Sequence, residues 1–110
     1  MSSEYILEQT ILEYLASSGA GFFWKNTSGG FFDGKKMRKH ASPFAINGTS
    51  DILGVLNGGQ FIAIEVKTTT TTTPQQDAFI KKVRALGGHA IVARSCDQVK
   101  QYIEGLTPTV

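Results

Sequence analysis

Three ionisable residues, Asp51, Glu65 and Lys67, stand around a predicted β-hairpin. Glu65 and Lys67 are two residues apart in one expected strand, so strand alternation places both side chains on the same face. If residues 57–59 form the hairpin loop, the register that follows places Asp51 directly across from Glu65, also on that face. The sequence therefore predicts two carboxylates and one lysine at one end of two paired strands.

Two carboxylates held this close repel each other, and folding alone gives no reason to bring them together. A hard divalent cation such as Mg²⁺ would offset the repulsion, since it binds a few carboxylate oxygens, a backbone carbonyl and several waters. A metal there could stabilise charge on a phosphate and lower the pKa of a bound water. Lys67 could orient or deprotonate that water, or neutralise the developing charge. Asp51 as a turn residue, with Glu65 and Lys67 as a solvated ion pair, is the alternative that these residues leave open.

A further carboxylate, Glu8, lies within the apolar stripe of a first helix expected at residues 4–16. Apolar residues form that stripe at three- and four-residue steps, namely Leu7, Ile11, Leu12, Tyr14 and Leu15. A carboxylate on a core-facing stripe is costly unless it is paired. Glu8 could therefore complete a metal shell, directly or through water, and Glu4 shares its side one turn earlier.

The elements that must position these groups follow in the order helix, three strands, helix, strand, helix. Strands are expected at residues 21–25, 51–56, 60–67 and 90–93. Two later helices are expected to begin at predicted capping boxes, formed by Thr73 with Gln76 and by Ser95 with Gln98. Both faces of the hairpin strands are mainly apolar, which predicts a sheet covered on both sides. The unit from residue 61 to residue 93 should be a right-handed parallel crossover.

Length and composition exclude several classes of protein. The chain has 110 residues, which predicts a single domain spanning residues 1–110. It contains no apolar run near the roughly 20 residues that span a membrane, and no secretory signal is visible at its start. Cys96 is the only cysteine, so neither an internal disulfide nor a multi-cysteine zinc site can form. We therefore expect a cytoplasmic protein without a membrane partner.

The net charge of +2 conceals an uneven distribution. Four basic residues occur within five positions, Lys35, Lys36, Arg38 and Lys39, which leaves seven basic and nine acidic residues elsewhere. A concentrated basic segment on a near-neutral body is typical of a protein that binds a phosphate backbone. A solvated loop explains the charge equally well. His40 is expected to be part of this loop, and His89 to be structural.

Asp51 followed by Glu65-Val66-Lys67 after a hairpin resembles the motif of the PD-(D/E)xK nucleases, with Ser50 where a proline often stands. The wider pattern resembles the VRR-NUC branch (virus-type replication–repair nucleases) over nearly the whole chain. It comprises residues 48–54, residues 64–67, Gln76 with Phe79, Gly87-Gly88 and residues 93–95. The resemblance implies an α/β fold with a restriction-endonuclease-like mixed sheet flanked by helices, in the order α-β-β-β-α-β-α.

The resemblance also implies roles for individual residues. Asp51 and Glu65 would be metal ligands with the Val66 carbonyl as a third, and Lys67 the catalytic lysine. Gln76 would lie near the water or metal, which does not exclude its role in the capping box. In the related archaeal-type junction resolvases a helix glutamate, a glycine, a basic residue and a Ser-Gly pair stand in positions similar to Glu8, Gly19, Lys25 and Ser28-Gly29. Glu8, Lys25 and Ser28 are therefore expected at the site or at the DNA.

The expected function is that of a Mg²⁺- or Mn²⁺-dependent endonuclease that cuts branched DNA such as four-way (Holliday) junctions. The resemblance to small stand-alone VRR-NUC proteins implies a homodimer, and the name of that family suggests a phage or prophage origin. No other small-molecule cofactor is expected. The basic segment would hold the DNA arms through phosphates, and part of the aromatic residues 22–24 and 31–32 would lie in the dimer interface. Trp24 taken alone is expected in the core rather than in the interface. A non-catalytic DNA-binding module with the same fold and a less selective duplex nickase are the alternatives.

Overall fold

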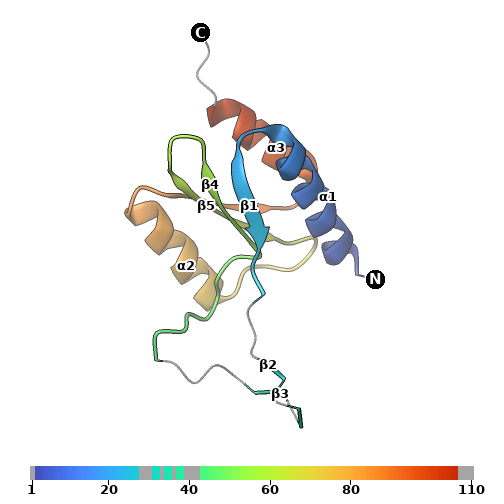
Figure 1. Cartoon of the computed structure of the whole chain (residues 1–110), viewed down its shortest axis with the longest axis vertical. Helices are drawn as coiled ribbons and strands as arrows, with labels where there is room; N and C mark the ends of the chain where they lie inside the picture. Colours follow the sequence, from blue (N-terminus) through green and yellow to red (C-terminus); the bar gives the residue numbers. More distant parts are fainter. Residues whose placement is uncertain (1, 28–30, 33, 36, 39–42, 107–110) are drawn as a thin grey trace.

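Four β-strands form one mixed sheet with helices on both of its faces (Figure 1). The computed structural model describes residues 2–27, 31–32, 34–35, 37–38 and 43–106. The sheet has the order β1-β4-β5-β6 and comprises β1 (Gly21–Lys25), β4 (Ile52–Leu56), β5 (Phe61–Val66) and β6 (His89–Ala93). The helices are α1 (Ser3–Ser18), α2 (Pro74–Ala85) and α3 (Cys96–Leu106). The predicted α/β class is confirmed. No helix among the described residues is long and apolar enough to span a lipid bilayer.

The β4–β5 hairpin has the predicted register. Ile52 lies opposite Ile64, and the Leu56 amide donates a hydrogen bond of 2.8 Å to the carbonyl of Gln60. The loop is therefore residues 57–59, and Gly58 within it has a positive φ of 98°, which favours glycine. Continuing the register by one position places Asp51 across from Glu65, as predicted.

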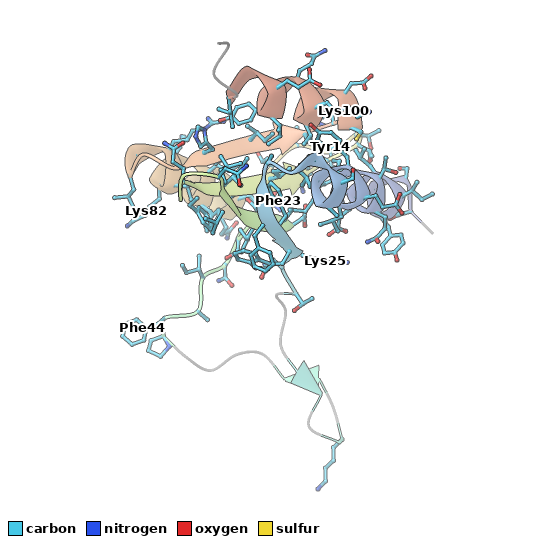
Figure 2. The ribbon with its side chains drawn as sticks, turned by 45° about the horizontal axis from the view of Figure 1, so that its top comes forward. Tyr14, Phe23, Lys25, Phe44, Lys82 and Lys100 are labelled. Atoms are coloured by element: carbon cyan, nitrogen blue, oxygen red, sulfur yellow. The ribbon has the colours of Figure 1, made fainter. Side chains whose placement is uncertain are left out.

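Helices pack on both faces of the sheet, as the apolar strands predicted, although on one face the helix covers only β5 and β6. α1 and α3 pack on one face, against a core cluster that includes Ile11, Leu15, Ile52, Ile62, Ile64, Val66 and Val99. α2 packs on the other face over β5 and β6, where the buried residues are Ala63, Ile80 and Ala90. α1 and α3 lie side by side, and the ammonium of Lys100 is 5.6 Å from the centroid of the Tyr14 ring (Figure 2).

Local capping fixes where the helices begin. Thr73 Oγ1 accepts a hydrogen bond from the Gln76 amide at 3.2 Å, and Gln76 Oε1 accepts one from the Thr73 amide at 2.9 Å. Ser95 and Gln98 form the same reciprocal pair at the start of α3. Both predicted capping boxes are confirmed. α1 is longer than expected, because Ser2 caps it by accepting a hydrogen bond from the Tyr5 amide.

The segment between β1 and β4 contains two short strands that are not among the predicted elements. β2 (Phe31–Phe32) and β3 (Met37–Arg38) pair antiparallel and lie apart from the four-stranded sheet (Figure 1). Two-residue strands carry no periodicity that a sequence could reveal. The parallel pairing of β5 with β6 around α2 agrees with the predicted crossover.

Candidate active site

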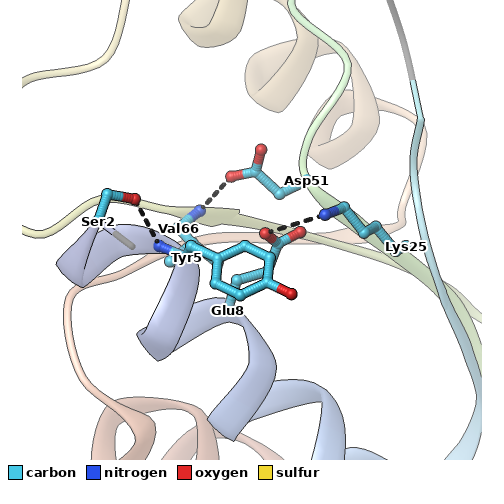
Figure 3. A network of polar contacts seen from close by, with 6 residues as sticks. All are labelled: Ser2, Tyr5, Glu8, Lys25, Asp51 and Val66. Carbon is cyan, nitrogen blue, oxygen red and sulfur yellow. Dashed lines mark hydrogen bonds and ion pairs between the residues drawn. The ribbon is translucent and has the colours of Figure 1, made fainter.

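Glu65 is a buried carboxylate at the end of β5, with only 2% of its surface exposed. The hairpin register brings Asp51 across from it, and Asp51 Oδ2 accepts a hydrogen bond of 2.8 Å from the Val66 amide (Figure 3). Burial, and then the negative charge of Asp51, raise the pKa of Glu65 to about 8. The predicted pair of carboxylates is therefore present and is electrostatically strained.

Each of the two carboxylates has one oxygen held by the protein. Asp51 Oδ2 is held by the Val66 amide, and Glu65 Oε1 accepts a hydrogen bond of 2.9 Å from Gln76 Nε2. Glu65 Oε2 is buried and has no hydrogen-bond partner among the described residues. When Glu65 is protonated it can share its proton with Asp51, which contributes to its raised pKa. When both carboxylates are ionised, no donor among the described residues forms a hydrogen bond with Glu65 Oε2. A buried acceptor without a hydrogen bond lowers the stability of the fold.

This oxygen set fits a hard divalent cation. Asp51 and Glu65 each use one carboxylate oxygen in the hydrogen bonds described above and have a second oxygen that could bind a metal. Mg²⁺ binds through one or two such carboxylates together with several retained waters. Across the part of the chain that the structure describes, no three His, Cys, Asp or Glu side chains group closely enough to hold a metal. The fit therefore rests on the carboxylates of Asp51 and Glu65 and on the backbone of Val66, which follows Glu65 and precedes Lys67.

Gln76 performs two tasks with one amide group. Its Oε1 completes the capping box at Thr73, and its Nε2 donates to Glu65. Because the cap uses the oxygen, the amide nitrogen is directed toward the carboxylate. The two interpretations of Gln76 from the sequence are thus compatible, and the residue holds Glu65 in one orientation.

Lys67 lies on the same strand face as Glu65, and its positive charge partly counteracts the rise in the pKa of Glu65. The backbone continues the parallel pairing here, because the Lys67 amide donates to the Ala93 carbonyl at 3.0 Å. Glu4 raises the pKa of Glu65 slightly, so the negative charge of Glu4 also acts on this site. The structure therefore brings Lys67 and the two carboxylates together as predicted.

Glu8 faces the core as its place in the apolar stripe predicted, but its partner is Lys25. Glu8 is 9% exposed, and its Oε2 is 3.5 Å from Lys25 Nζ (Figure 3). Lys25 also lies over the ring of Tyr5, at 5.5 Å from its centroid. This ion pair satisfies the buried carboxylate on the α1 side of the sheet. The structure does not group Glu8 with Asp51 and Glu65.

The other predicted DNA contacts lie mostly outside the described residues. Ser28, Lys36 and Lys39 belong to the undescribed positions, and only the backbone of Arg38 is described, within β3. Lys35 is exposed between β2 and β3. Lys25, the predicted DNA contact in β1, forms an ion pair with Glu8.

Gly48 is a positioning residue that the residue chemistry did not predict. Its φ is 86°, and a Cβ there would lie 2.4 Å from the carbonyl carbon and oxygen of Gln75 and 2.7 Å from the Gln76 amide nitrogen. The segment that leads to Asp51 is therefore pressed against the first turn of α2. This contact fixes Asp51 relative to Gln76, and its only trace in the sequence is the glycine itself.

Replacing Gly48 by alanine is expected to lower the free energy of unfolding by about 3 kcal/mol, because backbone strain and a backbone clash add. Gly58→Ala is the matched control, since Gly58 has a φ of 98° and a Cβ there would meet no atom of the described residues within 4 Å. It should cost about 1 kcal/mol from strain alone. Urea denaturation of both variants measures the difference, and equal losses would contradict the packing role of Gly48.

No protein-family model matches this sequence, and no curated protein matches it either. The assignment of a function therefore depends on the residues and geometry of the site.

Proposed function

We propose that this protein is a divalent-metal-dependent DNA endonuclease of the PD-(D/E)xK type, with a VRR-NUC-like arrangement of its elements. The observation that carries the proposal is the buried Oε2 of Glu65, unpartnered among the described residues and across from Asp51, with Lys67 on the same face. A module that only binds DNA gains nothing from this costly arrangement. Asp51, Glu65 and the Val66 carbonyl would hold Mg²⁺ or Mn²⁺, and Glu8 would act through water if its pair with Lys25 opens.

The chemistry divides between the metal and the protein. The bound cation would lower the pKa of a water and stabilise negative charge on the phosphate. Lys67 places a positive charge beside the carboxylates, where it can orient that water or neutralise charge on the reacting phosphate. Gln76 holds Glu65 by a 2.9 Å hydrogen bond and so keeps the second carboxylate oxygen free for the cation.

Branched DNA, such as a four-way junction, is the proposed substrate. No base-reading motif is evident, so recognition through phosphates and DNA shape is favoured over sequence. The basic segment at residues 35–39 supplies a concentrated positive charge for those phosphates. Neutralising it should weaken binding to all DNAs similarly and flatten the salt dependence of binding.

The test is cleavage of a labelled four-way junction, a splayed duplex and a plain duplex in Mg²⁺, in Mn²⁺ and in chelator. We expect cleavage of the junction with metal, none in chelator, and none by Asp51→Asn, which keeps the size of the side chain but removes its charge. Cleavage that persists in chelator would exclude the metal mechanism. Equal cleavage of plain duplex would favour a duplex nickase, and binding without cleavage in either metal would favour a non-catalytic module.

A further inference from the structure

β1 is an edge strand whose outer backbone groups form no ladder among the described residues. The carbonyl of Ala20 accepts from the Asn57 amide at 2.9 Å, and the Asn26 amide donates to the Asp51 carbonyl at 2.8 Å. Ala20, Asn26 and the alternate residues between them therefore direct their backbone groups toward β4. The amides and carbonyls of Gly21, Phe23 and Lys25 then face outward, because alternate residues of a strand bond to opposite sides.

The same strand presents an aromatic pair to solvent on the face that α2 covers elsewhere. Phe22 is 70% exposed, and its ring centroid is 5.4 Å from that of Trp24. Trp24 is 38% exposed, so the expected core position for this residue is wrong. Val55 lies opposite Phe22 in β4 and is 38% exposed. α2 packs over β5 and β6, which leaves this end of the face uncovered by it.

Proteins usually protect an edge like this one. Proline, a bulge or an inward-pointing charge prevents pairing with another chain. β1 contains no proline, and its one charged residue, Lys25, is drawn toward Glu8 on the opposite face. The edge is therefore competent to pair.

We propose that β1 pairs antiparallel with β1 of a second copy of this chain, about a two-fold axis at Phe23, so that two sheets join into one. The outward groups of Phe23 then bond with those of its counterpart, and Gly21 lies opposite Lys25 of the second copy. Phe22 lies directly opposite Trp24 of the second copy at a closely spaced, non-hydrogen-bonded position. The two aromatic pairs thus form one continuous row on one face.

A second copy fits this edge better than an unrelated peptide, because the strand is complementary to itself. Its outward groups are arranged symmetrically about Phe23, and glycine at one end leaves room for the long Lys25 side chain from the other. The resulting interface is isologous and closed, so the edge is used up in a dimer. The net charge of +2 does not oppose association of two copies.

The pairing would place the two candidate sites on the same face of the joined sheet. Asp51 lies beside Asn26, at the Lys25 end of β1. The two Asp51 residues would be separated by roughly 20 Å along the strands and roughly 15 Å across them. Two such sites suit two cuts in one branched DNA, and this consequence alone rests on the proposed function.

Sedimentation velocity tests the pairing. We expect a dimer for the wild-type chain, and at least 100-fold weaker dimerisation for Phe22→Glu with Trp24→Glu, which places like charges opposite each other. Phe22→Glu with Trp24→Lys places opposite charges across the pair and should restore the dimer. Leu86→Glu is the matched control, since Leu86 is 81% exposed and lies after α2. Circular dichroism checks that each variant is folded.

Cross-linking tests the register without charged substitutions. In a Cys96→Ser background, a mixture of Phe22→Cys chains and Trp24→Cys chains should form disulfide dimers at least tenfold faster than either chain alone. A wild-type monomer at 100 µM, a dimer insensitive to the charges, or equal cross-linking in all three samples would overturn the proposal. Glu65→Gln should dimerise normally, so failure of the nuclease proposal and failure of this pairing are distinguishable.

Discussion

Replacing Lys67 by alanine is expected to slow cleavage of junction DNA by about 10³-fold, with less than a threefold change in DNA affinity. The side chain shares a strand face with Glu65, and its charge lowers the pKa of Glu65 against the effect of burial. Removing it takes a positive charge from the reacting phosphate and also makes Glu65 harder to ionise. Affinity should persist, because the chain has 11 basic residues and four of them lie in the separate basic segment. Single-turnover rates measure the chemical step, and a filter-binding assay in Ca²⁺ measures affinity.

Lys81→Ala is the control for Lys67→Ala, because it makes the same charge change at an exposed position of α2. Its cleavage rate should stay within about twofold of the wild type, as for a surface substitution. Lys67→Arg separates two roles, since arginine keeps the charge but cannot act as a base. Cleavage by Lys67→Ala at the rate of Lys81→Ala would remove Lys67 from the mechanism.

The register of the β4–β5 hairpin could be predicted because it depends on short-range chemistry. Loop length and the glycines at 58 and 59 determine which residues pair, and one slipped residue would turn Asp51 away from Glu65. The capping boxes at Thr73 and Ser95 are local in the same sense. Each needs only four consecutive residues.

Contacts between distant segments could not be predicted, because they depend on how helices are set against the sheet. The apolar stripe predicted that Glu8 faces inward, but not that Lys25 would be its partner. Gly48 packs directly on Gln75, although the whole β4–β5 hairpin separates the two residues in the sequence. Family resemblance alone places Gln76 near the site, because its bond to Glu65 forms only after the parallel crossover carries α2 back over β5. A side chain can thus be assigned to a face from the sequence, whereas its partner requires the fold.

Glu65→Gln is expected to stabilise the metal-free protein at neutral and alkaline pH. The pKa of Glu65 rises from 4.5 to about 8 on folding, so between these values the native state keeps a proton that the unfolded chain has lost. The contribution of Glu65 to the free energy of unfolding of the wild type is therefore fully present below pH 4.5 and is lost as the pH rises through 8. The loss is about 1.4 kcal/mol per pH unit, or about 3 kcal/mol between pH 5 and pH 7. Glutamine does not titrate and avoids that loss.

Urea denaturation in chelator at pH 5, 7 and 9 measures this difference, with Glu13→Gln as the control at an exposed position of α1. Asp51→Asn should narrow the pH range over which stability is lost, and so reduce the total loss, because the charge of Asp51 is the second largest cause of the raised pKa. Adding Mg²⁺ at pH 8 should stabilise the wild type and not Glu65→Gln, since binding to the native state alone raises stability. Parallel pH profiles for the wild type and Glu65→Gln would show that Glu65 is not strained by its neighbour. In that case the main reason for placing a cation between Asp51 and Glu65 would be lost.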